Sequence, residues 1–322
     1  MNIAFLIAAH KDEQQLFRLV KKLLTIGDIY VHIDKKTTPS VFENFCNYLF
    51  SDYQNHVYVI NNQINVARGG YSQVKWIEEC LRSALMNKSV KYDRFFTLSG
   101  LDYPLWSTRK IMDYCTAHPD EQWFTVWNIS KSKDKRQQKK VRYYHLFRDI
   151  PLPHNSFWRR AIIVGSRLLL RGLGFRKPLQ VNIDNQICDV YVSSEWFSIT
   201  RPCAEYVIKQ LTTNKSLVHY FQTSYAPDEL VFATCIMASP YKKGIDEVIG
   251  EMSSGLVNRT KLHYIEYAGK IFSYSLKDYD KLMKSGKMFV RKLESGLSES
   301  LIAKIDEANS ETNMENSDKL NF

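Results

Sequence analysis

The sequence of 322 residues lacks several patterns that would assign a protein to a class directly. Its six cysteines are scattered and form no C-x-x-C pair, which argues against a zinc site and favours reduced, buried thiols in a cytosolic protein. No apolar run approaches the roughly 20 residues that a membrane-spanning helix requires. The N-terminal segment MNIAFLIAAHKDE has no basic region and no small-residue cleavage site. It therefore predicts a first β-strand and not a signal peptide.

The composition is that of a folded protein with an excess of positive charge. It is 44% hydrophobic and 24% charged, with a formal net charge of +10 and 13% aromatic residues. The length predicts one or two domains. A basic, aromatic-rich chain suits an anionic ligand: nucleic acid, an acidic lipid surface, or the diphosphate of an activated sugar. The run KSKDKRQQKK has no accompanying helix-turn-helix or RNA-binding signature, so we interpret it as a solvated loop and expect no nucleic-acid partner.

Apolar strand-like runs and amphipathic helix-like segments alternate over the first hundred residues. The predicted strands are NIAFLIAAH, IYVHI, VYVI and DRFFTLSG, and the predicted helices between them are DEQQLFRLVKKLL, PSVFENFCNYLF and YSQVKWIEECLRSALM. This alternation predicts an α/β fold with a parallel sheet whose ligands bind at the carboxyl ends of the strands. Four polar residues follow those ends and are expected on one rim: His10, Asp34, Arg68 and Asp102.

The pattern loosens after about residue 125. The segment FWRRAIIVGSRLLLRGLGFRK, residues 157–177, interleaves arginines with long apolar side chains. It is interpreted in two ways: as an amphipathic helix on a membrane surface, or as a basic helix packed on the core with its arginines outward. We predict one domain over residues 1–300 and a polar, disordered tail over residues 301–322.

Two further segments suggest chemistry. In APDELVFAT, Glu229 is either part of an ordinary acidic helix start or a general base that takes a proton from a sugar hydroxyl. Lys270, Arg291 and Lys292 are either solvated surface charges or a cationic clamp for a diphosphate. Charge-assisted hydrogen bonds to phosphate contribute about 1.5–3 kcal/mol each, so two or three could replace a divalent cation.

Acidic residues at two strand ends complete the set of candidates. Asp102, between Gly100 and Pro104, is part of a plain turn or contacts a ligand. Asp34 in YVHIDKK lacks the second aspartate of a metal-binding D-x-D, and Lys35 and Lys36 follow it. We therefore predict no metal site there.

Taken together, these segments resemble the core-2/I-branching enzyme family, the family-14 glycosyltransferases that include β-1,6-N-acetylglucosaminyltransferases and peptide O-xylosyltransferases. The resemblance covers most of residues 1–295 and is weakest between about 125 and 185. Its pieces stand in family order: FLIAAHKDEQQLFRLVKKL, YVHIDKK, ARGGYSQVKW, RFFTLSGLDYPL, VSSEWFSITR, APDELVFAT, LHYIEYAGKIFSYSLKDYDKL and GKMFVRKLE.

The resemblance implies a GT-A-like (Rossmann-type) mixed sheet flanked by helices in a single catalytic domain. It also implies inverting transfer from a UDP-sugar, without a metal or other cofactor. By this resemblance Glu229 is the catalytic base and Lys270, Lys292 and the adjacent Arg291 bind the diphosphate. The remaining nucleotide contacts are assigned to Ala9, His10, Asp34 and Asp102, and the substrate contacts to Arg142, Trp196 and Asp228.

The resemblance leaves the donor and acceptor open. We expect GlcNAc as the transferred sugar, with xylose or another UDP-linked sugar as the alternative, and a glycan or lipid-linked glycan as acceptor. The expected setting is synthesis of a bacterial surface polysaccharide by a cytoplasmic enzyme, with peripheral membrane contact through residues 157–177. The alternative from another class is a non-catalytic protein that binds a nucleotide or carbohydrate.

Overall fold

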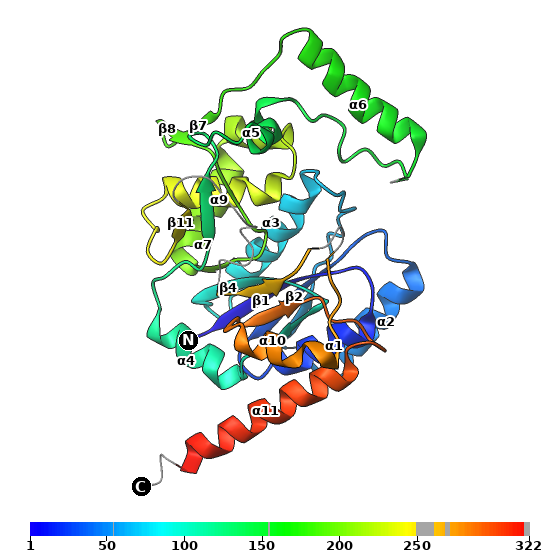
Figure 1. Ribbon diagram of the computed structural model, residues 1–322, viewed down its shortest axis with the longest axis vertical. Helices are drawn as coiled ribbons and strands as arrows, with labels where there is room; N and C mark the ends of the chain where they lie inside the picture. The colour runs from blue at the N-terminus through cyan, green and yellow to red at the C-terminus, as the bar shows by residue number, and fades with distance from the viewer. Residues whose placement is uncertain (54, 154, 249–260, 268–270, 319–322) are drawn as a thin grey trace.

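A parallel sheet with one antiparallel edge strand forms the centre of the computed structural model, which describes residues 1–53, 55–153, 155–248, 261–267 and 271–318 (Figure 1). Its strands stand in the order β10-β4-β1-β2-β3, and β10 pairs antiparallel with β4. They are β1 (Ile3–Ala9), β2 (Asp28–Ile33), β3 (Val57–Val59), β4 (Arg94–Ser99) and β10 (Ser198–Thr200). This arrangement confirms the predicted mixed α/β sheet flanked by helices.

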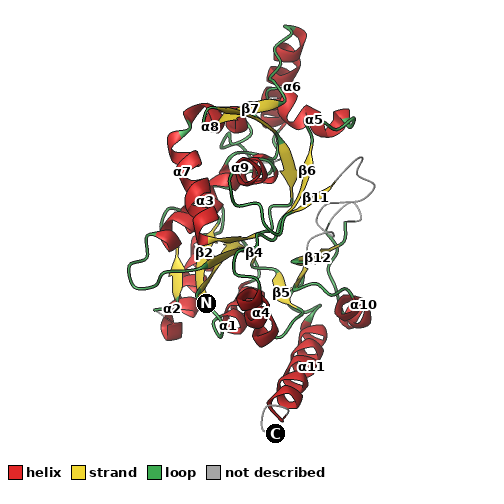
Figure 2. Ribbon diagram, turned by 90° about the vertical axis from the view of Figure 1, so that its left-hand side faces the viewer, coloured by secondary structure: helices red, strands yellow, loops and turns green. Residues whose placement is uncertain are grey.

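Alternate side chains of β1 enter different cores, because successive residues of a strand point to opposite faces. Ala4 and Leu6 pack in one core with α3 (Ser72–Leu85), whereas Ile3, Phe5 and Ile7 pack in another with α1 (Glu13–Leu23). Helices therefore cover both faces, as Figure 2 shows. The first face carries α3, α7 (Arg201–Thr213), α8 (Lys215–Gln222) and α9 (Val231–Ala238); the second carries α1, α2 (Pro39–Tyr53) and α4 (Thr108–Ala117).

The order of the strands determines where a ligand can bind. From β1 the chain moves outward through β2 to β3, then returns through α3 to β4 on the other side of β1. The loops that leave β1 and β4 consequently diverge. In open α/β sheets such a switch point opens a crevice beyond the carboxyl ends of the strands.

Three smaller sheets and the remaining helices lie outside the main sheet. The sheets are β11-β6-β9 (Asp246–Val248, Thr125–Asn128, Tyr191–Ser193), β12-β13-β5 (His263–Ile265, Phe289–Arg291, Asp102–Pro104) and the hairpin β7-β8 (Gln180–Ile183, Gln186–Asp189). The helices are α5 (Lys135–Arg142), α6 (Phe157–Gly172) and α10 (Tyr279–Lys284), with the 3₁₀ turns η1 (Pro227–Glu229) and η3 (Leu276–Asp278). In the part of the chain that the structure describes, no helix has both the length and the apolar character to cross a membrane.

The disordered tail predicted for residues 301–322 is instead helical as far as Asp318, in α11 (Glu299–Asp318). Leu301, Ile302 and Ile305 are buried in a third apolar core. Asp306 accepts hydrogen bonds from Lys22 at 2.6 Å and from the Tyr103 hydroxyl at 2.8 Å. The apolar residues of this segment are few, but their spacing puts them on one helix face.

Arg94 ties the edge of the main sheet to the loop after α4. Its side chain is fully buried, and its guanidinium donates to the carbonyls of His118 (2.8 Å) and Glu121 (2.9 Å) and to the Ser198 hydroxyl (3.2 Å). It also lies 3.9 Å from the centre of the Trp123 ring. Because a buried charge is expensive unless its hydrogen bonds are satisfied, this contact set is a structural requirement.

We expect Arg94→Ala to lower the free energy of unfolding by roughly 3 kcal/mol or more, because it leaves a cavity and buried carbonyls without donors. Arg94→Lys keeps the charge but lacks the several N–H donors of a guanidinium group, so it should lower the free energy of unfolding by less than Arg94→Ala does. Urea denaturation of the two variants and the wild type measures both values. A loss below about 1 kcal/mol for Arg94→Ala would show that Arg94 does not support the sheet.

Candidate active site

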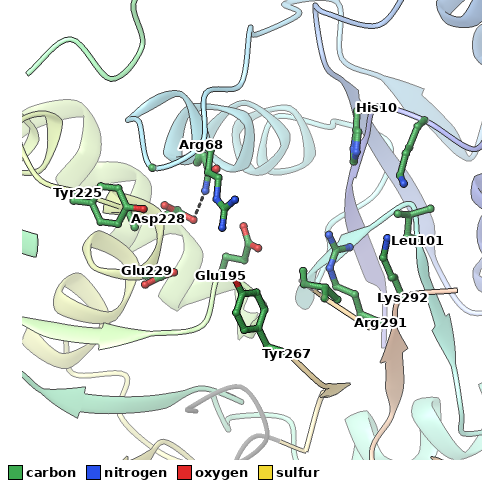
Figure 3. Close-up of a pocket in the computed structure, with 15 residues that line it drawn as sticks. His10, Arg68, Leu101, Glu195, Tyr225, Asp228, Glu229, Tyr267, Arg291 and Lys292 are labelled. Carbon is green, nitrogen blue, oxygen red and sulfur yellow. Dashed lines mark hydrogen bonds between the residues drawn. The ribbon is translucent and has the colours of Figure 1, made fainter. Parts of the chain in front are cut away.

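A cleft of about 520 Å³ opens at the switch point between β1 and β4 (Figure 3). His10 lies just past β1 and Leu101 just past β4, so the loops that leave these two strands form one side of the cleft. The other side comes from the segment around η1. The lining residues are His10, Lys11, Arg68, Gly69, Gln73, Leu101, Glu195, Tyr225, Ala226, Asp228, Glu229, Tyr267, Ile271, Arg291 and Lys292.

Carboxylates form one wall of the cleft. One interpretation of APDELVFAT is an acidic helix start, but the structure has a single 3₁₀ turn at Pro227–Glu229 before α9 begins at Val231. Ala226 precedes this turn with φ of 50°, a left-handed conformation that non-glycine residues adopt at a cost of roughly 1 kcal/mol. The resulting sharp turn places Glu229 in the cleft, where its Oε2 accepts a hydrogen bond from Lys140 at 2.5 Å.

Two more carboxyl groups, Asp228 and Glu195, belong to this wall. Asp228 is buried, and its Oδ2 accepts a hydrogen bond from Gln73 at 2.5 Å. Burial raises the pKa of Asp228 well above its usual value, and the nearby charges of Glu195 and Glu229 raise it further. Burial also raises the pKa of Glu195 to about 7, although the positive charge of Arg291 opposes that rise. Near neutral pH this wall therefore retains protons that exposed carboxyl groups would have lost.

Arg291, at the end of β13, begins the opposite, basic wall. Its Nη1 donates to Asp102 Oδ1 at 3.2 Å, and its guanidinium lies 4.8 Å from the centre of the Trp196 ring. Asp102 is 0% exposed and also accepts from the Ser99 amide at 2.8 Å, and its Oδ2 lies 3.0 Å from His263 Nε2. The buried carboxylate and the indole together fix the direction of the guanidinium.

Two lysines extend the basic wall. Lys292 and Lys11 both donate to Glu294 Oε1, at 3.1 Å and 2.8 Å. Hydrogen bonds, first of all from Lys11 and then from Ser273 and Lys292, hold the pKa of Glu294 at about 2. One carboxylate thus positions two ammonium groups, and the wall retains an excess of positive charge.

His10 lies on the same side of the cleft as the basic wall (Figure 3). Burial lowers the pKa of His10, and the positive charges of Arg291 and Lys11 lower it further. The imidazole is therefore neutral near pH 7. A neutral ring beside the cations is suited to stacking and hydrogen bonding, not to adding charge.

The structure brings together five of the predicted residues at the surface of the cleft: His10, Arg68, Glu229, Arg291 and Lys292. Asp228 lines it too, with its carboxyl group turned to Gln73. Three others, Ala9, Asp102 and Trp196, are buried behind the lining and support it. Asp102 contacts Arg291 from behind the lining, and its predicted contact with a nucleotide stays a prediction.

The remaining predicted residues lie elsewhere. Asp34 is buried beside the rim, where its Oδ1 accepts from the Lys36 amide at 2.9 Å and its Oδ2 lies 3.3 Å from the Lys36 ammonium group. Arg142 is exposed at the end of α5 and does not line the cleft. Lys140, two positions earlier on the same helix, reaches the site in its place. Lys270 lies outside the described residues.

Sequence reasoning missed Lys11, Lys140 and Glu195 as members of the site. Glu195 stands in the segment VSSEWFSIT, just after a short strand. A charged residue in that position could have been recognised as a candidate for the site. Lys140 stands in a basic run that we interpreted as a solvated loop. Among the described residues, no group of three or more His, Cys, Asp or Glu side chains is arranged to hold a metal ion.

Comparison with known proteins agrees with the sequence motifs. Residues 3–277 match the model of the Core-2/I-Branching enzyme family. The chain is 23% identical over 280 residues to mouse beta-1,3-galactosyl-O-glycosyl-glycoprotein beta-1,6-N-acetylglucosaminyltransferase 4, covering 84% of this chain and 54% of that protein. It is 24% identical over 252 residues to rat xylosyltransferase 1, covering 75% of this chain and 26% of that protein. The chain thus spans about half, or less, of the length of these relatives.

Among solved structures, 4-diphosphocytidyl-2C-methyl-D-erythritol synthase from Anaerococcus prevotii is similar with a TM-score of 0.35 and 11% identity, covering 78% of this chain and 90% of that one. A score this low adds nothing to the topology described above. The family match, in contrast, extends over most of the chain; it includes the acidic wall and His10 and Lys11, and it ends before Arg291 and Lys292. The chain belongs to the Core-2/I-Branching enzyme family.

Proposed function

We propose that this chain is an inverting glycosyltransferase that moves a sugar from a UDP-sugar to a hydroxyl group of a glycan or lipid-linked glycan. One observation carries the proposal: Glu229 lies on one wall of a cleft whose opposite wall holds Arg291 and Lys292 (Figure 3). Inverting transfer needs a base on the acceptor side and positive charge on the leaving-group side. The cleft offers both, on the two sides that an in-line displacement requires.

The basic wall is suited to the diphosphate that leaves. Arg291 is fixed between Asp102 and Trp196, and Lys292 is held by Glu294. Donors that are already in place need no reorganisation as negative charge develops on the leaving oxygen. At about 1.5–3 kcal/mol for each charge-assisted bond, these two cations support a mechanism that does not depend on a metal ion. Lys270 stays a predicted third member.

The acidic wall is suited to activating the acceptor. Lys140 holds Glu229 Oε2, so Oε1 remains to accept the proton of the attacking hydroxyl group. The acceptor oxygen bonds to the anomeric carbon as the bond from that carbon to the diphosphate oxygen breaks. The proton moves to Glu229, and the configuration at the anomeric carbon inverts because attack and departure occur on opposite faces.

Glu195, at the surface of the cleft, is suited to the hydroxyl groups of a sugar, and the buried Asp228 lies beside it. Their raised pKa values leave a proton on this pair near neutral pH, so the pair can both donate and accept hydrogen bonds. We propose GlcNAc as the transferred sugar, with xylose as the alternative, because relatives named for both transfers match the chain. UDP release across a panel of UDP-sugars distinguishes them. The bacterial polysaccharide setting and the cytoplasmic location stay predictions.

We expect Glu229→Gln to lower kcat for transfer by about 10²–10⁴-fold, the usual contribution of a general base, while the Kd for UDP changes little. The amide keeps the shape of the side chain but cannot take the proton. Steady-state release of UDP, measured with the best donor and with glycoside acceptors, gives kcat, and calorimetry gives Kd.

Glu247→Gln, on the exposed edge of β11, is the matched control and should keep wild-type kcat. A Glu229→Gln variant that retains most of its activity would remove Glu229 from the role of base. Loss of UDP binding in the same variant would assign Glu229 to donor binding instead.

We expect the free energy of unfolding of Glu195→Gln, measured relative to that of the wild type, to rise by about 2 kcal/mol between pH 5 and pH 8. In the unfolded chain a glutamate loses its proton near pH 4.3, whereas folded Glu195 retains it to about pH 7. The folded state thus binds more protons across this window, so the stability of the wild type falls as pH rises. Urea denaturation at several pH values measures the difference. A constant difference, or an equal trend in Glu247→Gln, would contradict the raised pKa.

A further inference from the structure

Helix α6 and the residues after it stand out from the body of the protein, at the end opposite α11 (Figure 1). In this helix only Arg159 and Ile163 are buried. Phe157 is 74% exposed and Trp158 is 70% exposed. Further large apolar side chains are exposed along the same segment: Ile162, Leu168, Leu169, Leu173 and Phe175.

The outward face of α6 is apolar along its whole length. With 3.6 residues per turn, two adjacent stripes form on one side of the helix. An added Cβ at Gly165 or Gly172 would meet no atom within 4 Å, so this side faces open space. The stripes are Phe157, Ala161, Gly165, Leu168 and Gly172, and next to them Trp158, Ile162, Leu169 and Leu173.

The arginines do not occupy that face: Arg160 and Arg171 are exposed beside it, whereas Arg159 is buried. Arg159 turns toward the protein and donates to the Arg148 carbonyl at 2.6 Å. By the helical period, Arg160, Arg167 and Arg171 fall together along one edge of the apolar face. Residues 150–183 contain six Lys or Arg and no Asp or Glu. The exposed surface of this segment thus combines apolar and aromatic side chains with positive charge alone.

We propose that α6 docks in the headgroup region of a lipid bilayer that carries anionic lipids. An interfacial helix buries an apolar face a short way into the bilayer, while flanking Lys and Arg side chains contact anionic headgroups. A second copy of this chain would be a less suitable partner for the apolar face of α6. A two-fold contact would bring the same patch of each subunit together, and this patch has no acidic residue to meet the arginines.

The docked helix is connected to the rim of the cleft. Arg148, which receives the bond from Arg159, donates to the Arg68 carbonyl at 2.9 Å and lies 4.8 Å from the centre of the Tyr225 ring. Arg68 and Tyr225 both line the cleft. Docking would therefore hold the rim near the membrane surface. The docking itself does not depend on the proposed transfer reaction and is tested without it.

Flotation of the full-length chain with lipid vesicles tests the proposal. The vesicles are phosphatidylcholine alone, or phosphatidylcholine with 30% phosphatidylglycerol, a chosen proportion of roughly physiological negative charge. The variants are Gly165→Glu, which puts a charge in the apolar face, and Gly165→Ala, which does not. Both side chains enter open space, and both residues favour a helix more than glycine does, so neither should lower the Tm.

We expect the wild type and Gly165→Ala to float with the anionic vesicles, with binding weakened in 0.5 M salt, a concentration at which screening is roughly complete beyond a few Å. Gly165→Glu should lower the partition coefficient by about tenfold or more, the cost of burying one charge. Three results would overturn the proposal: a wild type that does not float, equal flotation of both variants, or binding that is unchanged without anionic lipid. Light scattering that finds a wild-type dimer dissociated by Gly165→Glu would assign the face to a second copy instead.

Discussion

The carboxylate of Asp102 is the contact on which the basic wall of the cleft depends. It is fully buried, and it meets the amide of Ser99 at the end of β4, the ring of His263 on β12 and the guanidinium of Arg291 on β13. One side chain thus joins the main sheet to the small sheet that carries the cations. Removing one partner from such a buried ionic contact typically costs about 3–5 kcal/mol. Arg291 therefore has little freedom to turn away from the cleft.

The separation of charge in the cleft follows from the topology. The residues at the ends of β1 and β13 form the basic wall. The turn before α9 and the segment after β9 form the acidic wall. Each wall contains its own stabilising contacts: Glu294 holds two ammonium groups on one side, and Lys140 holds Glu229 on the other. Each wall consequently keeps its own set of charges, and a polarised substrate can lie between the two sets.

The sequence predicted the N-terminal half of the fold well because its signals are local. Apolar runs such as that of β1, followed by amphipathic helices, leave few alternative arrangements. Contacts between distant segments were harder to predict. The basic segment around α5 contains one buried residue, Val141, so its sequence indicates little about which side faces the cleft. Lys140, which contacts Glu229, was therefore not singled out. Likewise, the outward face of α6 follows from the bond between Arg159 and Arg148, which sequence periodicity cannot reveal.

The central claim is that fixed cations of this chain bind the diphosphate of a nucleotide. Calorimetric titration of the protein with UDP and with uridine, both in excess EDTA, tests that claim most directly. Two charge-assisted contacts predict that UDP binds about 100-fold or more tightly than uridine, and that Arg291→Ala removes a large part of the difference. Equal affinities for UDP and uridine, or UDP binding that appears only when Mn²⁺ is added, would contradict the account.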